Sequence, residues 1–159
     1  MASVAAKKAT KGGAAQRLIL ERFLPYRLSI LSNRVSRAIA ARYARAFDLT
    51  IPEWRIIAVL GRQPGLTAKE VAEATEMDKV AVSRAVAKLV AAKRVSAEAH
   101  DEDGRAQVLT LTAHGEALHA RIAPIALDAE RRLLASLGVK ERLQFDRLID
   151  RLLSAAHDL

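Results

Sequence analysis

Residues 67–91 read TAKEVAEATEMDKVAVSRAVAKLVA, and this stretch decides the fold. Thr67 and Glu70 have the spacing of a capping box, in which each side chain accepts a hydrogen bond from the backbone N–H of the other residue. A short helix therefore begins at this point. Asp78 has the side chain of an N-cap and starts a second helix a few residues later. That second helix has one apolar side, formed at i, i+4 and i+7 by Val82, Val86 and Leu89.

The opposite side of the second helix is polar and basic, and it carries Lys79, Ser83, Arg84 and Lys88. From Lys79 to Arg94 the chain has five positive charges and no acid. A charged helix face is ordinarily just solvated. Here the acid-free block directly follows a capped helix and a tight turn, which favours contact with DNA. An α-helix fits the major groove, where its N-terminal residues reach base edges.

After these helices the apolar periodicity changes to two, between Val95 and Thr112. The pair Asp103-Gly104 is a strong hairpin signal, because both central residues of a type I′ turn need a positive φ. We expect two strands, at about 95–100 and 106–112, with Arg105 beside the tip. Two short helices followed by such a hairpin predict a winged helix-turn-helix.

The rest of the chain is predicted to be helical, so the fold class is mainly α with a small β-hairpin. A further capping box, Thr50 with Glu53, opens a helix that ends in a turn from Gly61 to Gly65. Residues 16–24 have a helical pattern, and Pro25 separates them from a long helix that reaches Phe47. Two helices, at 113–136 and 140–156, close the chain, with a kink at Pro124 and a C′ glycine at Gly138. The expected parts are a disordered basic tail (1–13), N-terminal dimerisation helices (14–49), a DNA-binding lobe (50–112) and C-terminal dimerisation helices (113–159).

Composition narrows the possible functions of this 159-residue chain. It contains no cysteine, which excludes a disulfide scaffold, a thiolate metal site and a thiol-based redox sensor within the chain. The net charge of +8 fits a polyanionic partner. No apolar run approaches the roughly 20 residues of a membrane span, and the basic start lacks the apolar segment of a secretory signal. We expect a cytoplasmic protein.

Catalytic and metal-binding patterns are missing from the sequence. The histidines, which are His100, His114, His119 and His157, lack the spacing of metal ligands. No Ser-His-Asp order, phosphate-binding glycine loop or pair of catalytic carboxylates occurs in a recognisable frame. We expect neither an enzyme nor a requirement for a metal or cofactor.

The sequence resembles the multiple antibiotic resistance regulator (MarR) family of dimeric bacterial transcription factors, from residue 24 to about residue 155. The resemblance is carried by the stretches 49–57 (LTIPEWRII), 66–72 (LTAKEVA), 77–89 (MDKVAVSRAVAKL) and 101–112 (DEDGRAQVLTLT). It includes the Asp-x-Arg wing pattern, here Asp103 and Arg105. The resemblance implies a triangular homodimer held by the terminal helices, with residues 67–75 and 78–91 as the helix-turn-helix. Three positions depart from the family pattern: Val80, His100 and Gly104.

Roles in DNA binding follow for seven residues. Arg84 is expected to read a base, since its guanidinium can pair with guanine O6 and N7. Lys79 and Lys88 are expected to contact phosphates. Asp103 either forms an ordinary surface ion pair with Arg105 or orients it toward a narrow minor groove. The predicted DNA-binding residues are Lys79, Val80, Ser83, Arg84, Lys88, Asp103 and Arg105.

Trp54, the only tryptophan, has two possible roles. It can be an ordinary core side chain between the long helix and the DNA-binding lobe. Alternatively it lines a pocket in which relatives of the MarR family often bind small aromatic acids. An arginine in an apolar cleft suits a carboxylate. The predicted ligand-binding residues are Tyr26, Ser29, Asn33, Arg37 and Trp54.

We therefore expect a homodimeric repressor that binds a pseudo-palindromic operator in double-stranded DNA and is released by a small aromatic or phenolic acid. A two-fold dimer calls for a two-fold site. The alternative is a constitutive or architectural DNA-binding protein without an effector. The sequence does not distinguish a repressor of transcription from an activator.

Overall fold

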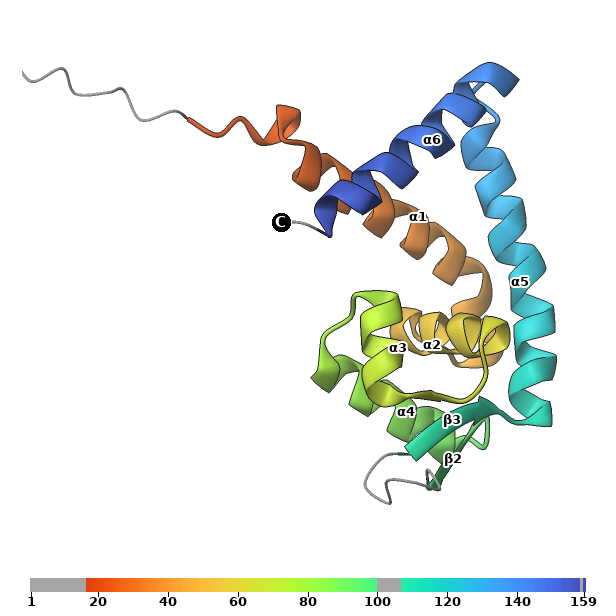
Figure 1. Cartoon of the computed structure of the whole chain (residues 1–159). Coiled ribbons are helices and arrows are strands. Elements are labelled where there is room, and N and C mark those ends of the chain that lie inside the picture. The colour runs from red at the N-terminus through yellow and green to blue at the C-terminus, as the bar shows by residue number, and fades with distance from the viewer. Residues whose placement is uncertain (1–16, 100–106, 158) are drawn as a thin grey trace, which may run out of the picture. The chain divides into compact units, whose positions relative to one another are not determined.

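A computed structural model of the protein describes residues 17–99, 107–157 and 159 (Figure 1). Its elements are, in order, η1 (Leu20–Arg22), α1 (Leu24–Phe47), α2 (Ile51–Arg62), β1 (Leu66–Thr67), α3 (Ala68–Thr75), α4 (Lys79–Ala91), β2 (Val95–Ala99), β3 (Gln107–Leu111), α5 (Ala113–Leu134) and α6 (Val139–Ala156). The prediction of a mainly helical winged helix-turn-helix is confirmed. No helix among the described residues is long and apolar enough to cross a membrane.

The chain divides into two compact units, residues 1–33 and 34–159. In the described part of the first unit, the expected helix over 16–24 was wrong. Only the single 3-10 turn η1 forms, and Phe23 after it is extended. The reason is Pro25, which has no N–H for a carbonyl one turn earlier and so disfavours a helix that continues from residues 16–24. Instead Pro25 lies in the first turn of α1, where a missing N–H costs nothing.

The second unit is built around the lobe from α2 to β3, whose three helices pack on one another and on a small antiparallel sheet. The strand order is β1-β3-β2, with Leu109 of β3 opposite Leu66 on one side and Ala97 on the other. β1 was not predicted from the sequence, because two residues are too few to show a period. The buried core joins side chains of all these elements to the end of α1 and the start of α5: Tyr43, Leu49, Ile56, Ile57, Leu60, Leu66, Val71, Ala72, Val82, Ala85, Leu89, Val95, Leu109, Leu118 and Ile122.

Hydrogen bonds confirm the predicted starts of α2 and α3. The Thr50 N–H donates to Glu53 Oε2 at 2.8 Å, and the Thr67 N–H donates to Glu70 Oε2 at 2.7 Å. Gly61, which we expected in a turn, lies inside α2 instead. A Cβ at this position would come within 2.8 Å of the His119 imidazole of α5. The glycine therefore permits the close approach of α2 and α5, and the turn begins only after Arg62.

α5 leads away from β3 and α6 turns back from its far end (Figure 1). α5 continues through Pro124 as one helix. Gly138 is the N-cap of α6 and not the C′ residue of α5, because Glu141 accepts its N–H at 2.7 Å and its φ is −68°. An ion pair between Arg42 and Asp128, 2.8 Å long, ties α1 to α5. The hydrogen bond from Arg42 holds the pKa of Asp128 below its ordinary value, helped by the charges of Arg132 and Arg131.

Candidate DNA-binding site

α4 presents two chemically different sides. Val82, Ala85 and Leu89 are buried in the lobe core. The other side is exposed and carries every DNA-contact residue predicted on this helix, namely Lys79, Val80, Ser83, Arg84 and Lys88. Val80 is 55% exposed, so this aliphatic side chain is available to a partner and does not serve the core. The apolar side anchors α4 in the core, and the basic side is exposed.

The N-terminus of α4 is fixed by its cap. One carboxylate oxygen of Asp78 accepts the backbone N–H groups of Val80 and Ala81, at 2.9 and 3.1 Å. The preceding turn is closed by Glu76, which has a left-handed φ of 50° and donates its N–H to carbonyls in α3. These local bonds hold α3 and α4 in a helix-turn-helix, with the first turn of α4 exposed.

The cations on α4 differ in their surroundings. Lys88 Nζ lies 4.0 Å from Oε1 of Glu53, a carboxylate that is buried while it caps α2. Within the described residues, no acidic side chain pairs with Arg84 or Lys79. Arg84 is thus free to pair with a base, whereas Lys88 would share its charge between Glu53 and a phosphate.

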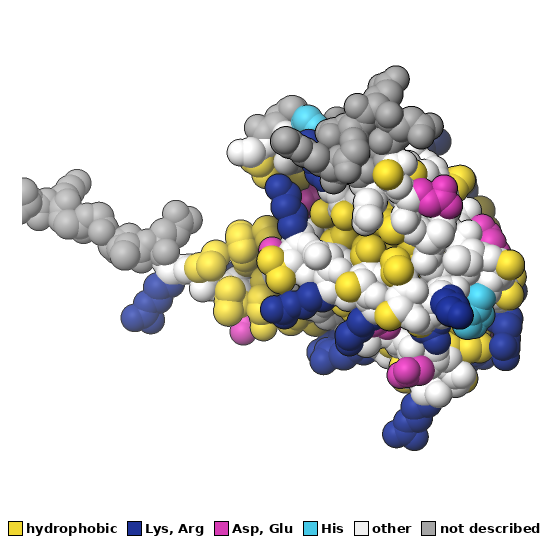
Figure 2. All heavy atoms as spheres, turned by 90° about the horizontal axis from the view of Figure 1, so that it is seen from below, with side chains coloured by type: hydrophobic (Ala, Val, Ile, Leu, Met, Phe, Trp, Pro, Cys, Tyr) yellow, Lys and Arg dark blue, Asp and Glu magenta, His cyan; other side chains and the backbone are white. Residues whose placement is uncertain are grey.

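Figure 2 looks onto the end of the molecule that carries α4 and the sheet. Lys and Arg side chains stand out from this face at several separate points, and much of the surface between them is uncharged. Separate cations around an uncharged centre can meet phosphates on both sides of a groove while other side chains approach the bases.

β2 and β3 form the two strands of the predicted hairpin, which is the wing of the winged helix-turn-helix. The two strands pair from Val95 with Leu111 to Ala99 with Gln107. The hydroxyls of Ser96 and Thr110 lie 2.6 Å apart across the pair. The tip residues that we singled out, His100, Asp103, Gly104 and Arg105, lie outside the described residues, so the roles of Asp103 and Arg105 remain predictions.

The residues predicted to bind a ligand fall into both units. In the first unit, Asn33 Nδ2 donates to Ser29 Oγ at 3.5 Å, one helical turn apart, and Tyr26 is partly exposed. In the second unit, Arg37 is exposed. The grouping of all five residues remains a prediction.

Trp54 has the surroundings of a core side chain. Its ring stacks on His119, with centroids 5.9 Å apart and planes at 24°, and it meets Tyr43 at the same centroid distance. It also packs against the buried core. Among the described residues, no three His, Asp or Glu side chains gather closely enough to hold a metal ion.

Comparisons with known proteins agree with this geometry. Residues 47–106 match the sequence profile of the MarR family. The HTH-type transcriptional repressor Rv2887 of Mycobacterium tuberculosis is 31% identical over 131 residues, which make up 82% of this chain and 91% of that protein. A MarR/EmrR family transcriptional regulator from Acinetobacter sp. ADP1 has a similar structure, with a TM-score of 0.80 and 27% identity over 89% of this chain and all of that chain.

A second similar structure has a bound ligand. The PcaV transcriptional regulator of Streptomyces coelicolor was solved in complex with its natural ligand, and the TM-score is 0.69. Its identity to this chain is 24%, and the similarity covers 89% of this chain and 99% of PcaV. At this identity the comparison supports the fold alone.

Proposed function

Since the chain belongs to the MarR family of transcriptional regulators, we propose that it is a homodimeric repressor that binds a pseudo-palindromic operator and leaves it when a small aromatic or phenolic acid binds. The observation that carries the proposal is α4, a capped helix with a buried apolar side and an exposed basic side. Family membership makes it a DNA-binding regulator. The dimer, the operator symmetry and the effector are the proposed parts.

Base reading is assigned to the first half of α4. Arg84 has no acidic partner among the described residues, so its planar guanidinium is available for two hydrogen bonds to guanine. Val80 and Ser83 lie on the same exposed side, where an aliphatic group suits a thymine methyl and a hydroxyl suits either donor or acceptor. Lys79 and Lys88 are assigned to phosphates, which position the helix without selecting a sequence.

Dimerisation is supported by the apolar side chains that the single chain leaves uncovered. α6 has no buried residue at all. Six of its large apolar side chains are each at least 40% exposed: Val139, Leu143, Phe145, Leu148, Leu152 and Leu153. A helix with so much exposed apolar surface calls for a partner surface. In a two-fold dimer, the same surface of the second copy provides it.

Release by a ligand is proposed from the resemblance to the MarR family and from PcaV, which was solved in complex with its natural ligand. An effector acts only through its different affinity for two shapes of the dimer. The shape that releases DNA would hold the two recognition helices at a spacing other than one turn of DNA, about 34 Å. The residues proposed to hold the acid are Tyr26, Ser29, Asn33, Arg37 and Trp54.

Binding to a selected operator and to random DNA tests the proposal. Arg84→Ala should reduce the ratio of the two affinities, since one bidentate base contact discriminates by about 1 to 3 kcal/mol. Lys88→Ala should weaken binding to both DNAs alike and lower the salt slope by about one. Lys69→Ala, at an exposed lysine of α3 that pairs with Glu73, is the matched control. Equal affinity and equal salt dependence on both DNAs for the natural chain would point instead to a constitutive, charge-driven binder.

A further inference from the structure

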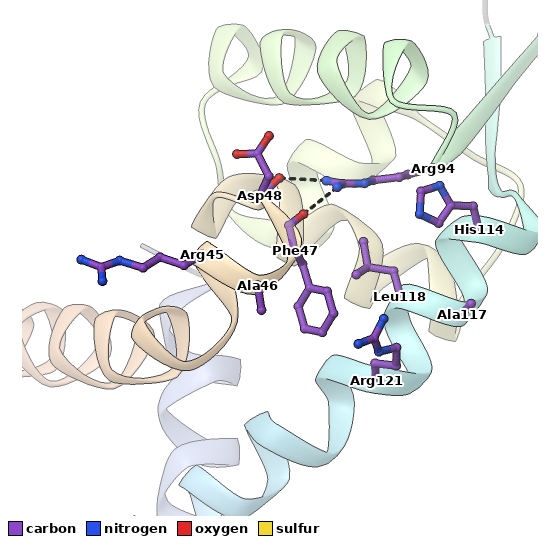
Figure 3. A pocket seen from close by; sticks show the side chains of 9 residues that line it. All are labelled: Arg45, Ala46, Phe47, Asp48, Arg94, His114, Ala117, Leu118 and Arg121. Atoms are coloured by element: carbon purple, nitrogen blue, oxygen red, sulfur yellow. Dashed lines mark hydrogen bonds between the residues drawn. The ribbon is translucent and has the colours of Figure 1, made fainter.

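The end of α1 is closed by a side chain from a distant turn. Asp48, the residue after the helix, has a left-handed φ of 46°, and the Leu49 N–H donates to the Ala44 carbonyl at 3.3 Å. The last carbonyls of a helix have no N–H of their own helix to accept. At this end the carbonyls of Phe47 and Asp48 accept from the guanidinium of Arg94, at 2.6 and 2.9 Å (Figure 3). Arg94 therefore caps α1 from outside the helix.

Arg94 belongs to the turn that leads from α4 into β2. Its N–H donates to the Leu89 carbonyl of α4 at 2.9 Å, and its carbonyl accepts the Thr112 N–H at 3.1 Å. Thr112 is the N-cap of α5, and its hydroxyl also donates to the Lys93 carbonyl at 2.7 Å. Gly115 of α5 approaches the Arg94 carbonyl so closely that a Cβ there would collide with it. The backbone of this turn is thus fixed on α4 and α5, while the Arg94 side chain reaches α1.

The guanidinium of Arg94 forms no ion pair. Within the described part of the chain, no carboxylate pairs with it, although the residue is half-buried. Its Nε is buried and has no hydrogen-bond partner. A buried donor without an acceptor is unfavourable, and the partial removal of a charge from water adds to this cost. A planar guanidinium can hold two acceptors in fixed directions, so its role here is geometric.

Other contacts between α1 and the lobe constrain the angle between them less. Arg55 of α2 donates to Ser36 Oγ of α1 at 3.4 Å, which is long for a hydrogen bond. Tyr43 of α1 and Leu49 after it are buried in the lobe core, and apolar contacts of this kind have no preferred direction. The two short hydrogen bonds of Arg94 are directional. They determine the angle at which the lobe, with α4 in it, meets the end of α1.

We propose that Arg94 is a positioning residue for DNA recognition: it fixes the direction of the lobe on α1 and, in the dimer, the spacing of the two α4 helices. Only the second half rests on the proposed function, since the lobe and the end of α1 belong to one compact unit of one chain. One extra base pair between two half-sites moves them about 3.4 Å apart and turns them by about a tenth of a turn. A lobe that can rock on α1 would therefore accept several spacings.

Pulsed electron spin resonance between two spin labels tests the first half of the proposal. The chain has no cysteine, so Ala41→Cys on α1 and Val90→Cys on α4, both exposed, provide the two attachment sites. An excess of unlabelled chain ensures that each labelled copy pairs with an unlabelled one. The distance distribution should be narrow when Arg94 is present. It should be broader or displaced in Arg94→Gln and in Arg94→Lys, because lysine keeps the charge but cannot bridge two carbonyls.

Arg45→Gln is the matched control for these distances. Arg45 is an exposed arginine in the last turn of α1, and its side chain points away from Arg94 (Figure 3). The variant loses the same charge and should keep the narrow distribution. An unchanged distribution in Arg94→Gln, or equal broadening in Arg45→Gln, would overturn the proposal. A narrow distribution in Arg94→Lys would show that charge alone suffices and would overturn the bridge.

Binding to operators of altered spacing tests the second half. A selected operator is compared with versions that carry one or two extra base pairs between the half-sites. The natural chain should prefer the selected spacing. Arg94→Gln should reduce this preference about tenfold, the factor that corresponds to one lost hydrogen bond of a charged group. Arg45→Gln should keep the preference, whereas a role of Arg94 in stability alone would lower the urea midpoint and leave the preference intact.

The two tests separate this inference from the proposed function. If the natural chain has no preferred spacing but the label distances broaden in Arg94→Gln, the two-fold operator is wrong and Arg94 still positions the lobe. If the natural chain prefers one spacing while Arg94→Gln retains both the preference and the narrow distribution, the proposed operator stands and the inference about Arg94 is wrong.

Discussion

The DNA-binding lobe and α6 are both built from amphipathic segments, yet they reach opposite states in a single chain. In the lobe, Ile56, Ile57 and Val71 are completely buried. In α6 no residue is buried, and Leu153 is 67% exposed. The lobe therefore carries its stabilising contacts within one chain, whereas α6 must obtain them from another surface.

This difference can be tested by measuring how stability depends on protein concentration. A helix of 18 residues is marginal in water by its intrinsic preference, and most helical stability comes from burial of the apolar face. Changes in the lobe should therefore alter stability independently of protein concentration. Changes on the apolar face of α6 should act through association.

The largest effect is expected at Gly115, where the first turn of α5 packs against the lobe. Gly115→Ala places a Cβ against the backbone carbonyl of Arg94, so one of the two segments must shift. Overpacking of this kind costs about 1 to 3 kcal/mol, and a backbone obstacle favours the upper end of the range. Urea unfolding measures the loss. Gly138→Ala, whose Cβ would meet only Glu141 Oε2 at 3.4 Å, is the control. Equal stability of the two variants would contradict the close approach at Gly115.

On α6, Leu148→Glu should break the proposed dimer while the lobe remains folded. The substitution occurs twice in a two-fold interface and places two charges in an apolar surface. We expect the dissociation constant of the dimer to rise at least about 100-fold, as at interface hot spots. Sedimentation equilibrium measures it, with Lys140→Gln as the control. A dimer of unchanged affinity would place the interface elsewhere.

The pH dependence of stability provides the next test through Tyr43, a residue of α1 that is part of the buried core. Burial raises the pKa of Tyr43 to about 12, against an ordinary value of 10.0. The folded state therefore favours the neutral phenol. This contribution is complete below pH 10 and is lost as the pH rises toward 12. Two pKa units correspond to about 2.7 kcal/mol.

Between pH 9 and pH 12, the free energy of unfolding should fall less for Tyr43→Phe than for the natural chain. Urea unfolding over this range, which brackets both pKa values, measures the difference. Tyr26→Phe removes a partly exposed phenol and is the control. If natural chain and Tyr43→Phe lose stability in parallel, the burial of Tyr43 does not govern the alkaline transition.

Local signals in the sequence were sufficient to predict the three helices of the lobe and the strands β2 and β3. Thr50, Thr67 and Asp78 each bond to a backbone N–H a few residues away, so their capping patterns are visible without knowledge of the fold. The basic side of α4 was predictable for the same reason, because the helical period places Lys79, Ser83, Arg84 and Lys88 opposite the buried side. These features depend on neighbours in sequence.

Features that depend on distant neighbours were not predictable. Gly61 was read as a turn because nothing in the sequence places His119 of α5 against it. The role of Arg94 was missed, since its partners Phe47 and Asp48 lie more than forty residues earlier. Left-handed positions at Glu76 and Lys93 were also hidden, because glycine is the usual signal for that conformation and neither residue is glycine.

The smallest expected effect is at Lys93, in the turn between α4 and β2. Its φ is 54°, and its N–H donates to the Val90 carbonyl at 2.9 Å, so the turn requires this conformation. A residue with a Cβ is destabilised by about 1 to 2 kcal/mol in this conformation. Glycine removes most of this cost, although it makes the unfolded chain more flexible. We expect Lys93→Gly to stabilise the protein by about 0.5 to 1 kcal/mol, or about 1 to 4 °C in melting temperature. Lys93→Ala loses the same charge but keeps the Cβ, so it should not gain this stability. Because the turn belongs to the lobe, the gain should not change with protein concentration. A Lys93→Gly variant no more stable than Lys93→Ala would show that the left-handed turn carries no strain.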